Sequence, residues 1–112
     1  MNVRLLRNTV KHMCSKKLVQ MEYWFDKGPC GTVGCIAGTR CLMDRRPDEK
    51  DPFSYAATRF GLTIPQAESL FYVDNWPDEL YARWYDAKLA RARRSILRAA
   101  VEDFIATEGS SS

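Results

Sequence analysis

The segment over residues 30–43, CGTVGCIAGTRCLM, is the feature that most limits how this chain can fold. From residue 33 onward it is apolar on nearly every side of a helix, and Gly34 and Gly38 share one face of that helix. A helix that is apolar all round belongs inside a bundle, where another backbone can approach the two glycines. Thr32 suits the N-cap position. The sequence therefore predicts a buried central helix over residues 33–43.

Helical start and stop signals occur on both sides of this segment. A first helix begins after Asn2, which can cap it. Two short helices meet at Gly61, the first opened by Asp51-Pro52 and the second by a capping box over residues 63–66. A long helix should then run over residues 78–106. Because no strand pair is convincing, the pattern predicts an all-α bundle of about five helices.

Composition and charge narrow the class of protein. With 112 residues, of which 46% are hydrophobic and 28% charged, we expect one globular domain over residues 1–108 and a disordered tail over 109–112. A net charge of +3 is too small by itself to indicate nucleic-acid binding. The N-terminus lacks the apolar core of a signal peptide, and no apolar run approaches the roughly 18 residues of a membrane span. We therefore expect a cytoplasmic protein with no membrane partner and reduced thiols.

The four cysteines lack the spacing of paired C-x-x-C metal motifs: they are Cys14, Cys30, Cys35 and Cys41. If any pair holds a metal ion or closes a redox disulfide, it is Cys30 and Cys35. A nucleophilic thiol would need His12, the only histidine, as its base. The glycine-rich loop also lacks the Gly-Lys-Ser/Thr ending of a phosphate-binding loop. We expect small buried thiols, no cofactor, no catalytic residue and no enzyme; a zinc or redox module stays an alternative.

The predicted last helix carries a basic stripe next to aromatic residues. The residues expected to bind a partner are Trp84, Lys88, Arg91, Arg94 and Arg98. Arginine and aromatic side chains anchor protein interfaces, so the stripe suits an acidic protein partner. The same cations could contact the phosphates of a nucleic acid, and the 13 aromatic residues could also support a homodimer. A solvated helix face, with the rings closing the core, is the plain alternative.

Several short motifs resemble those of a family of small bacterial and phage-borne proteins with no assigned activity. The motifs are Cys30-Gly31-Thr32 with Cys35 and Gly38, Phe60-Gly61-Leu62-Thr63 with Gln66-Ala67 and Leu70-Phe71, and Trp76-Pro77. Thr39-Arg40 departs from the family's pattern of a larger apolar residue and a small one. The resemblance implies a compact helical fold and occurrence on mobile elements. We therefore expect a non-enzymatic protein-binding module that inhibits a host or bacterial machine, including an anti-defence, anti-CRISPR-like role; a nucleic-acid-binding regulator is the alternative.

Overall fold

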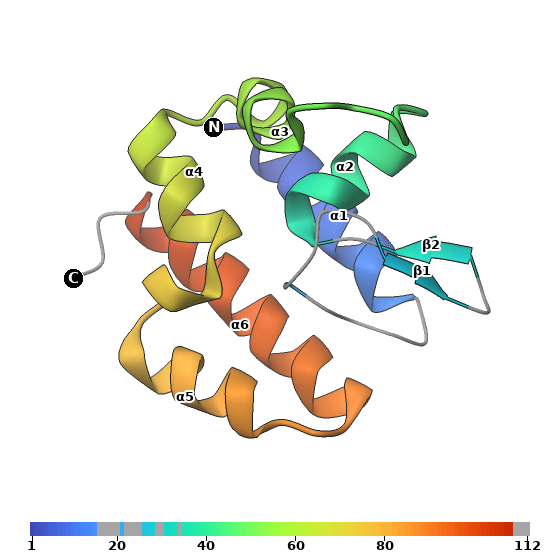
Figure 1. Ribbon diagram of the computed structural model, residues 1–112. Helices are drawn as coiled ribbons and strands as arrows, with labels where there is room; N and C mark the ends of the chain where they lie inside the picture. Colours follow the sequence, from blue (N-terminus) through green and yellow to red (C-terminus); the bar gives the residue numbers. More distant parts are fainter. Residues whose placement is uncertain (16–20, 22–25, 29–30, 34, 109–112) are drawn as a thin grey trace.

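The computed structural model describes residues 1–15, 21, 26–28, 31–33 and 35–108 (Figure 1). Its helices are α1 (Val3–Cys14), α2 (Ile36–Met43), α3 (Pro52–Phe60), α4 (Ile64–Phe71), the 3-10 turn η1 (Val73–Asn75), α5 (Asp78–Asp86) and α6 (Ala90–Thr107). The all-α prediction is confirmed, with six α-helices in the described ranges instead of about five. Cys30, Gly34 and the tail over residues 109–112 lie outside the described residues.

The central helix begins later than the sequence pattern predicts. Residues 31–33 form a short strand, β2 (Gly31–Val33), which pairs antiparallel with β1 (Asp26–Gly28), so that Asp26 lies opposite Val33. The predicted start at residue 33 and the predicted N-cap at Thr32 are therefore wrong; Cys35 takes the N-cap position. β-branched residues such as Thr32 and Val33 favour extended backbone, and here pairing with β1 satisfies their backbone groups.

The predicted burial of the central helix is confirmed for its first six residues, 36–41, which are all buried. This includes Arg40, whose burial is unexpected for a charged side chain. In Figure 1, α2 lies against α1 and α3, and the short hairpin extends from the same end of the molecule. The core continues through large buried rings, including Phe60 and Phe71, whose centroids are 6.2 Å apart.

The predicted long helix over residues 78–106 is wrong as one continuous element. α5 ends at Asp86, and the backbone is extended at Ala87 and Leu89 before α6 begins. The break lets α5 fold back beside α6, as Figure 1 shows. In that arrangement Trp84 is fully buried, and the Arg93 Nε–H donates to the Ala87 carbonyl over 3.3 Å. Tertiary packing thus outweighs the helical propensity of the segment.

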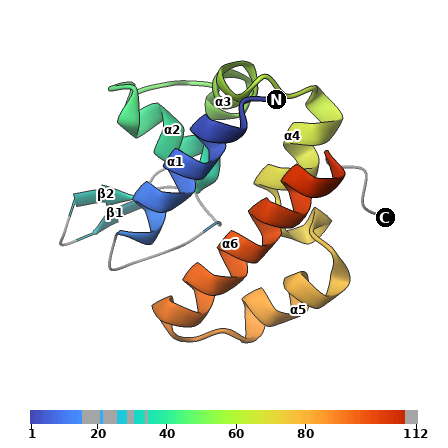
Figure 2. The ribbon, with the colours of Figure 1, turned by 180° about the vertical axis from the view of Figure 1, so that it is seen from behind.

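Helices from the two ends of the chain lie side by side. Figure 2 shows α1 and α6 next to each other and nearest the viewer. They run in opposite directions, because Arg7 near the start of α1 contacts Glu102 near the end of α6. The charges of Arg94 and Arg98 in turn act on Cys14 at the end of α1. Every helix within the described ranges is too short or too polar to cross a lipid bilayer.

Candidate functional site

The α1/α6 pair gathers positive charge from two distant stretches of the chain. Residues 1–21 contain five Lys or Arg and no Asp or Glu, and residues 87–101 contain another five without an acidic residue. Ten of the 17 basic residues therefore belong to these two stretches, while all 14 acidic residues lie elsewhere in the sequence. The net charge of +3 hides this separation, because the rest of the chain is acidic.

Each of the two helices presents a row of cations with the same spacing. The rows are Arg4, Arg7 and Lys11 on α1, and Arg91, Arg94 and Arg98 on α6; we call these six residues the cationic face. Residues spaced i, i+3 and i+7 lie on one side of a helix. Because the two helices are antiparallel and Arg7 pairs with Glu102, the two rows meet at Lys11 and Arg98 and extend from there in opposite directions. Of these six residues, the site predicted from the sequence included only the three on α6, although the acid-free stretch at the N-terminus pointed to the α1 row.

A groove of about 300 Å³ separates the two rows. It is lined by Arg7, Val10, Lys11, Arg98, Val101 and Glu102. Val10 and Val101 are buried, so they form its floor, whereas Lys11 and Arg98 are exposed. No salt bridge to Lys11 or Arg98 is formed within the described ranges. Two exposed cations therefore face solvent on either side of an apolar floor.

The Arg7–Glu102 ion pair closes one end of this groove. Arg7 Nη2 lies 2.8 Å from Glu102 Oε1, and Arg7 Nε lies 3.1 Å from Oε2, which is the bidentate geometry of a guanidinium and a carboxylate. The hydrogen bond from Arg7 lowers the pKa of Glu102, and the same bond raises the pKa of Arg7. Both side chains are more than half exposed, so the pair orients Arg7 more than it stabilises the fold.

The structure separates the residues that the sequence placed in one partner-binding site. Arg91 and Arg98 are exposed on α6, and Arg94 is half-buried between them. Lys88 is exposed but lies in the connection between α5 and α6, because the long helix is broken there. Arg98 and Arg94 act on Cys14, lowering a thiol pKa that burial raises more strongly.

Trp84 is wrong as a partner-binding residue because it is fully buried. Its ring packs edge-to-face on Trp76 at 5.5 Å, and the Arg93 guanidinium lies 4.8 Å from the ring centroid on a face of the indole. The exposed rings of α5 are Tyr81 and Tyr85, at 41% and 53% exposure. Trp84 lies on the side of α5 that faces the core, where its large ring buries much apolar area.

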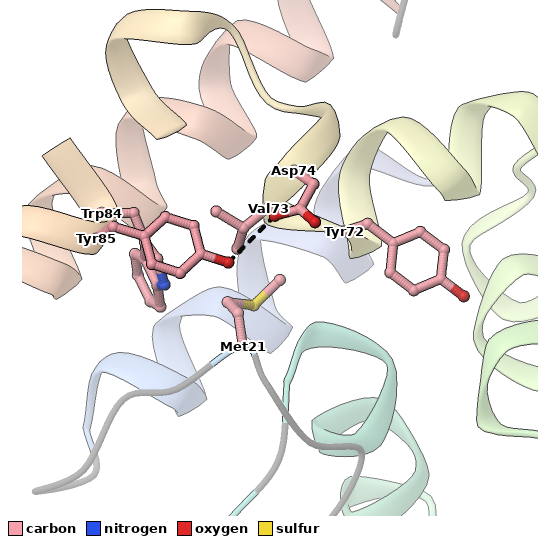
Figure 3. A pocket seen from close by; sticks show the side chains of 6 residues that line it. All are labelled: Met21, Tyr72, Val73, Asp74, Trp84 and Tyr85. Carbon is pink, nitrogen blue, oxygen red and sulfur yellow. Dashed lines mark hydrogen bonds between the residues drawn. The ribbon is translucent and has the colours of Figure 1, made fainter. Parts of the chain in front are cut away.

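A second, smaller hollow lies beside Tyr85. It has a volume of about 120 Å³ and is lined by Met21, Tyr72, Val73, Asp74, Trp84 and Tyr85 (Figure 3). The Tyr85 hydroxyl donates to Asp74 Oδ1 over 3.1 Å. The Tyr72 ring points away from this hydrogen bond in Figure 3 and stacks on Phe53 with centroids 5.8 Å apart. This hollow shares no lining residue with the groove between α1 and α6 in the part of the chain that the structure describes.

The described thiols have properties of core side chains. Cys35 and Cys41 are buried, and burial raises the pKa of each to about 11. A thiol with this pKa stays protonated at neutral pH and is a poor nucleophile. Among the residues that the structure describes, no three His, Cys, Asp or Glu side chains are grouped so that they could hold a metal ion. A metal ion or disulfide shared by Cys30 and Cys35 stays an alternative, since Cys30 lies outside those residues.

An ion-pair network that is buried at Arg40 and exposed at Arg59 joins α1, α2 and α3 on another side of the molecule. Arg40 donates from Nη1 to Thr9 Oγ1 over 3.2 Å and from Nη2 to Asp44 Oδ1 over 2.7 Å. Asp44 Oδ2 accepts from the Tyr55 hydroxyl at 2.8 Å and from Arg59 Nε at 2.9 Å. Burial alone would raise the pKa of Asp44, but these hydrogen bonds outweigh it and lower that pKa to about 2. The network holds three helices together, which explains the charged residues in this core.

Comparison with known proteins adds no assignment to these surfaces. No family model, no curated protein and no solved structure matches this chain. The resemblance to small phage-borne proteins therefore stays a prediction, and function is argued from the surfaces themselves.

Proposed function

We propose that this protein is a non-enzymatic, cytoplasmic binding module that docks its cationic face on the phosphate backbone of a nucleic acid. The observation that carries the proposal is the charge separation: cations from two acid-free basic stretches, far apart in the sequence, lie on α1 and on the part of α6 that precedes Glu102, and these two helices are neighbours. Neutralised phosphates release their counterions, and this release drives most sequence-independent binding. Cations from two helices offer more phosphate contacts than the single stripe on α6 would.

The composition of the groove favours a duplex over a single strand. Among the described residues its lining contains valine, charged side chains and no aromatic ring. Proteins that bind single strands stack bases on aromatic side chains, and protein interfaces also rely on aromatic anchors. Trp84, the ring expected beside the arginines, is buried in the core. Positioning contacts to a duplex backbone need only cations, which the cationic face supplies.

Fluorescence anisotropy with a labelled 20-base-pair duplex across a salt series tests this proposal. The variant Lys11→Gln/Arg98→Gln removes the two exposed groove cations, and Lys50→Gln/Arg83→Gln removes two exposed cations elsewhere. For each lost phosphate contact, the slope of the logarithm of the association constant against the logarithm of the salt concentration should become shallower by about 0.9. We expect the groove variant to lose about two such contacts and the control variant to bind as the unmodified protein does.

A third variant tests the proposal in the opposite direction. Glu102→Gln removes the one carboxylate among the described lining residues and releases Arg7 from its bidentate pair. Duplex binding should tighten and its salt slope should steepen, since one more cation becomes available. Absence of duplex binding at 50 mM salt, or equal losses in the groove and control variants, would contradict the proposal.

A protein-binding inhibitor is the second candidate function, because α5 leaves two tyrosine rings exposed. In this case the partner is a host or bacterial protein, and an anti-defence role fits the resemblance described above. Affinity capture from a bacterial lysate compares Arg91→Ala/Arg94→Ala/Arg98→Ala with Tyr81→Ala/Tyr85→Ala. Loss of a captured protein in the tyrosine variant alone would favour this candidate over nucleic-acid binding. Loss of nuclease-sensitive material in the arginine variant would favour the first.

A further inference from the structure

We infer that the exposed side of α5 and the adjoining turn η1 form a binding site for a lysine- and arginine-rich segment of a partner protein. The site consists of Asp74, Asp78, Tyr81 and Tyr85, which we call the acidic tyrosine surface. This inference does not depend on the proposed nucleic-acid binding, because it uses different residues from a different part of the molecule.

The four residues come together through helix geometry and one hydrogen bond. Asp78, Tyr81 and Tyr85 are spaced i, i+3 and i+7, so they lie on one side of α5. Asp74 comes from η1 and accepts the hydrogen bond from the Tyr85 hydroxyl over 3.1 Å. The rings of Tyr81 and Tyr85 are 4.9 Å apart and inclined at 59°. All four side chains are exposed.

The charge around this surface selects the partner. The segment of η1 and α5, residues 73–86, contains Asp74, Asp78, Glu79 and Asp86 and one cation, Arg83, so it has a net charge of −3. A cation is attracted to a carboxylate and to the face of a tyrosine ring, and arginine can use both at once. An acidic or purely apolar partner would meet unfavourable charge or leave the carboxylates unpaired. A basic segment is the partner that this chemistry fits.

The hollow beside Tyr85 sets the size of the group that can enter. Figure 3 shows the Tyr85 hydroxyl and the Asp74 carboxylate meeting beside Val73 and above Met21. The volume of about 120 Å³ is well below the roughly 300 Å³ at which small-molecule pockets begin. It is large enough for part of one long side chain. We assign the hollow to the aliphatic stem of an arginine or lysine, whose charged group then lies at Asp74.

Binding of a defined peptide tests the inference. The probe is a fluorescein-labelled 12-residue peptide in which six arginines alternate with six serines, and anisotropy measures its dissociation constant. Tyr81→Ala/Tyr85→Ala removes both rings, and Asp74→Asn/Asp78→Asn removes both charges with little change in shape. Two cation–π contacts, at about 0.5–1 kcal/mol each, correspond to roughly a five- to thirtyfold weaker affinity. We expect a loss in this range for each variant, with unchanged circular dichroism.

The matched control is Asp48→Asn/Glu108→Gln, which removes two exposed carboxylates outside the acidic tyrosine surface. It should bind the arginine peptide with an affinity within twofold of the unmodified protein. An equal loss of affinity in this control would show that the peptide binds by general charge attraction, and it would overturn the inference. So would full affinity in the tyrosine variant, or a dimer in sedimentation that depends on Tyr85 and excludes the peptide. Duplex binding, measured in parallel, should stay unchanged in the tyrosine variant.

Discussion

Removal of Asp44 should cost far more stability than removal of its buried partner Arg40. The Arg40 side chain is only 6% exposed, and its Nε has no hydrogen-bond partner among the described residues. Asp44 neutralises this guanidinium over 2.7 Å but also accepts hydrogen bonds from Tyr55 and Arg59. The two partners are therefore unequal: Arg40 depends on Asp44, whereas Asp44 keeps two other donors when Arg40 is replaced.

The structure sets the expected magnitudes. In Asp44→Ala a buried guanidinium loses its counter-charge, and breaking a buried ion pair in this way costs about 3–5 kcal/mol in the free energy of unfolding. In Arg40→Met an apolar side chain of similar length replaces the guanidinium, and the desolvation cost of the unpaired Nε disappears. We expect Arg40→Met to change stability by less than about 1.5 kcal/mol. The double variant should therefore be more stable than Asp44→Ala.

Urea denaturation at pH 7, followed by circular dichroism at 222 nm, measures these differences. If Asp44→Ala does not fold, the comparison of the folded double variant with Arg40→Met gives the cost of losing Asp44 when no buried guanidinium is present, and folding of the double variant alone shows that Arg40 causes the rest of the loss. Equal losses in the two single variants, or losses that add in the double variant, would refute the unequal roles assigned to Arg40 and Asp44. Conserved m-values are the control that all variants unfold between comparable states.

The pH dependence of stability gives an independent measurement of how strongly the folded protein stabilises the Asp44 carboxylate. Hydrogen bonds lower the pKa of folded Asp44 to about 2, against an ordinary value of 3.8. The resulting stabilisation is complete above about pH 5 and is lost as the pH falls from about 4 toward 2, because the unfolded state binds the proton more tightly. It amounts to at most about 2 kcal/mol, since Arg59 is partly solvated. Asp44→Asn should lack this component, so the same pH dependence of stability in this variant and in the unmodified protein would contradict the assignment.

Three further predictions concern packing, backbone and thiols. Trp84→Ala should lower the free energy of unfolding by about 3–5 kcal/mol in thermal denaturation, because the ring is fully buried; a loss below about 1 kcal/mol would place it at the surface. Gly61→Ala should lower the free energy of unfolding by about 1 kcal/mol in the same assay, because Gly61 has φ +68°, which disfavours a side chain. Steric overlap adds nothing to this cost, since the atom nearest to an added Cβ would lie at an ordinary contact distance of 3.6 Å. Native alkylation followed by peptide mapping should modify half-buried Cys14 well before Cys35 and Cys41; faster reaction of Cys35 would indicate an accessible thiolate.

Local signals in the sequence predicted the helix ends well. Asn2 accepts from the Leu5 N–H over 3.0 Å, as expected for the first N-cap. Thr63 and Gln66 form the predicted capping box, with both reciprocal hydrogen bonds present. Gly61 ends α3 in the left-handed conformation. Each of these signals acts over three or four residues, so neighbouring side chains and backbone are sufficient to produce it.

The errors occurred where distant segments compete with local preference. No glycine or proline marks residues 87–89, yet the helix breaks there so that Trp84 can enter the core. Residue 33 fits a helix locally but pairs with Asp26 in the hairpin. Arg40 interrupts an otherwise apolar helix, and only Asp44, Thr9 and the packing of three helices make its burial possible.

The sequence by itself determined the all-α class, the helix ends at Asn2, Gly61 and Thr63, and the basic character of the last helix, because these follow from short-range hydrogen bonding and from the periodicity of apolar residues. The tertiary structure alone decided which charges become neighbours. It brought Lys11 of α1 to the same groove as Arg98 of α6, turned Trp84 inward and left Tyr81 and Tyr85 exposed. Pairing of helices from opposite ends of the chain depends on how whole apolar faces pack, and no local window of sequence contains that information.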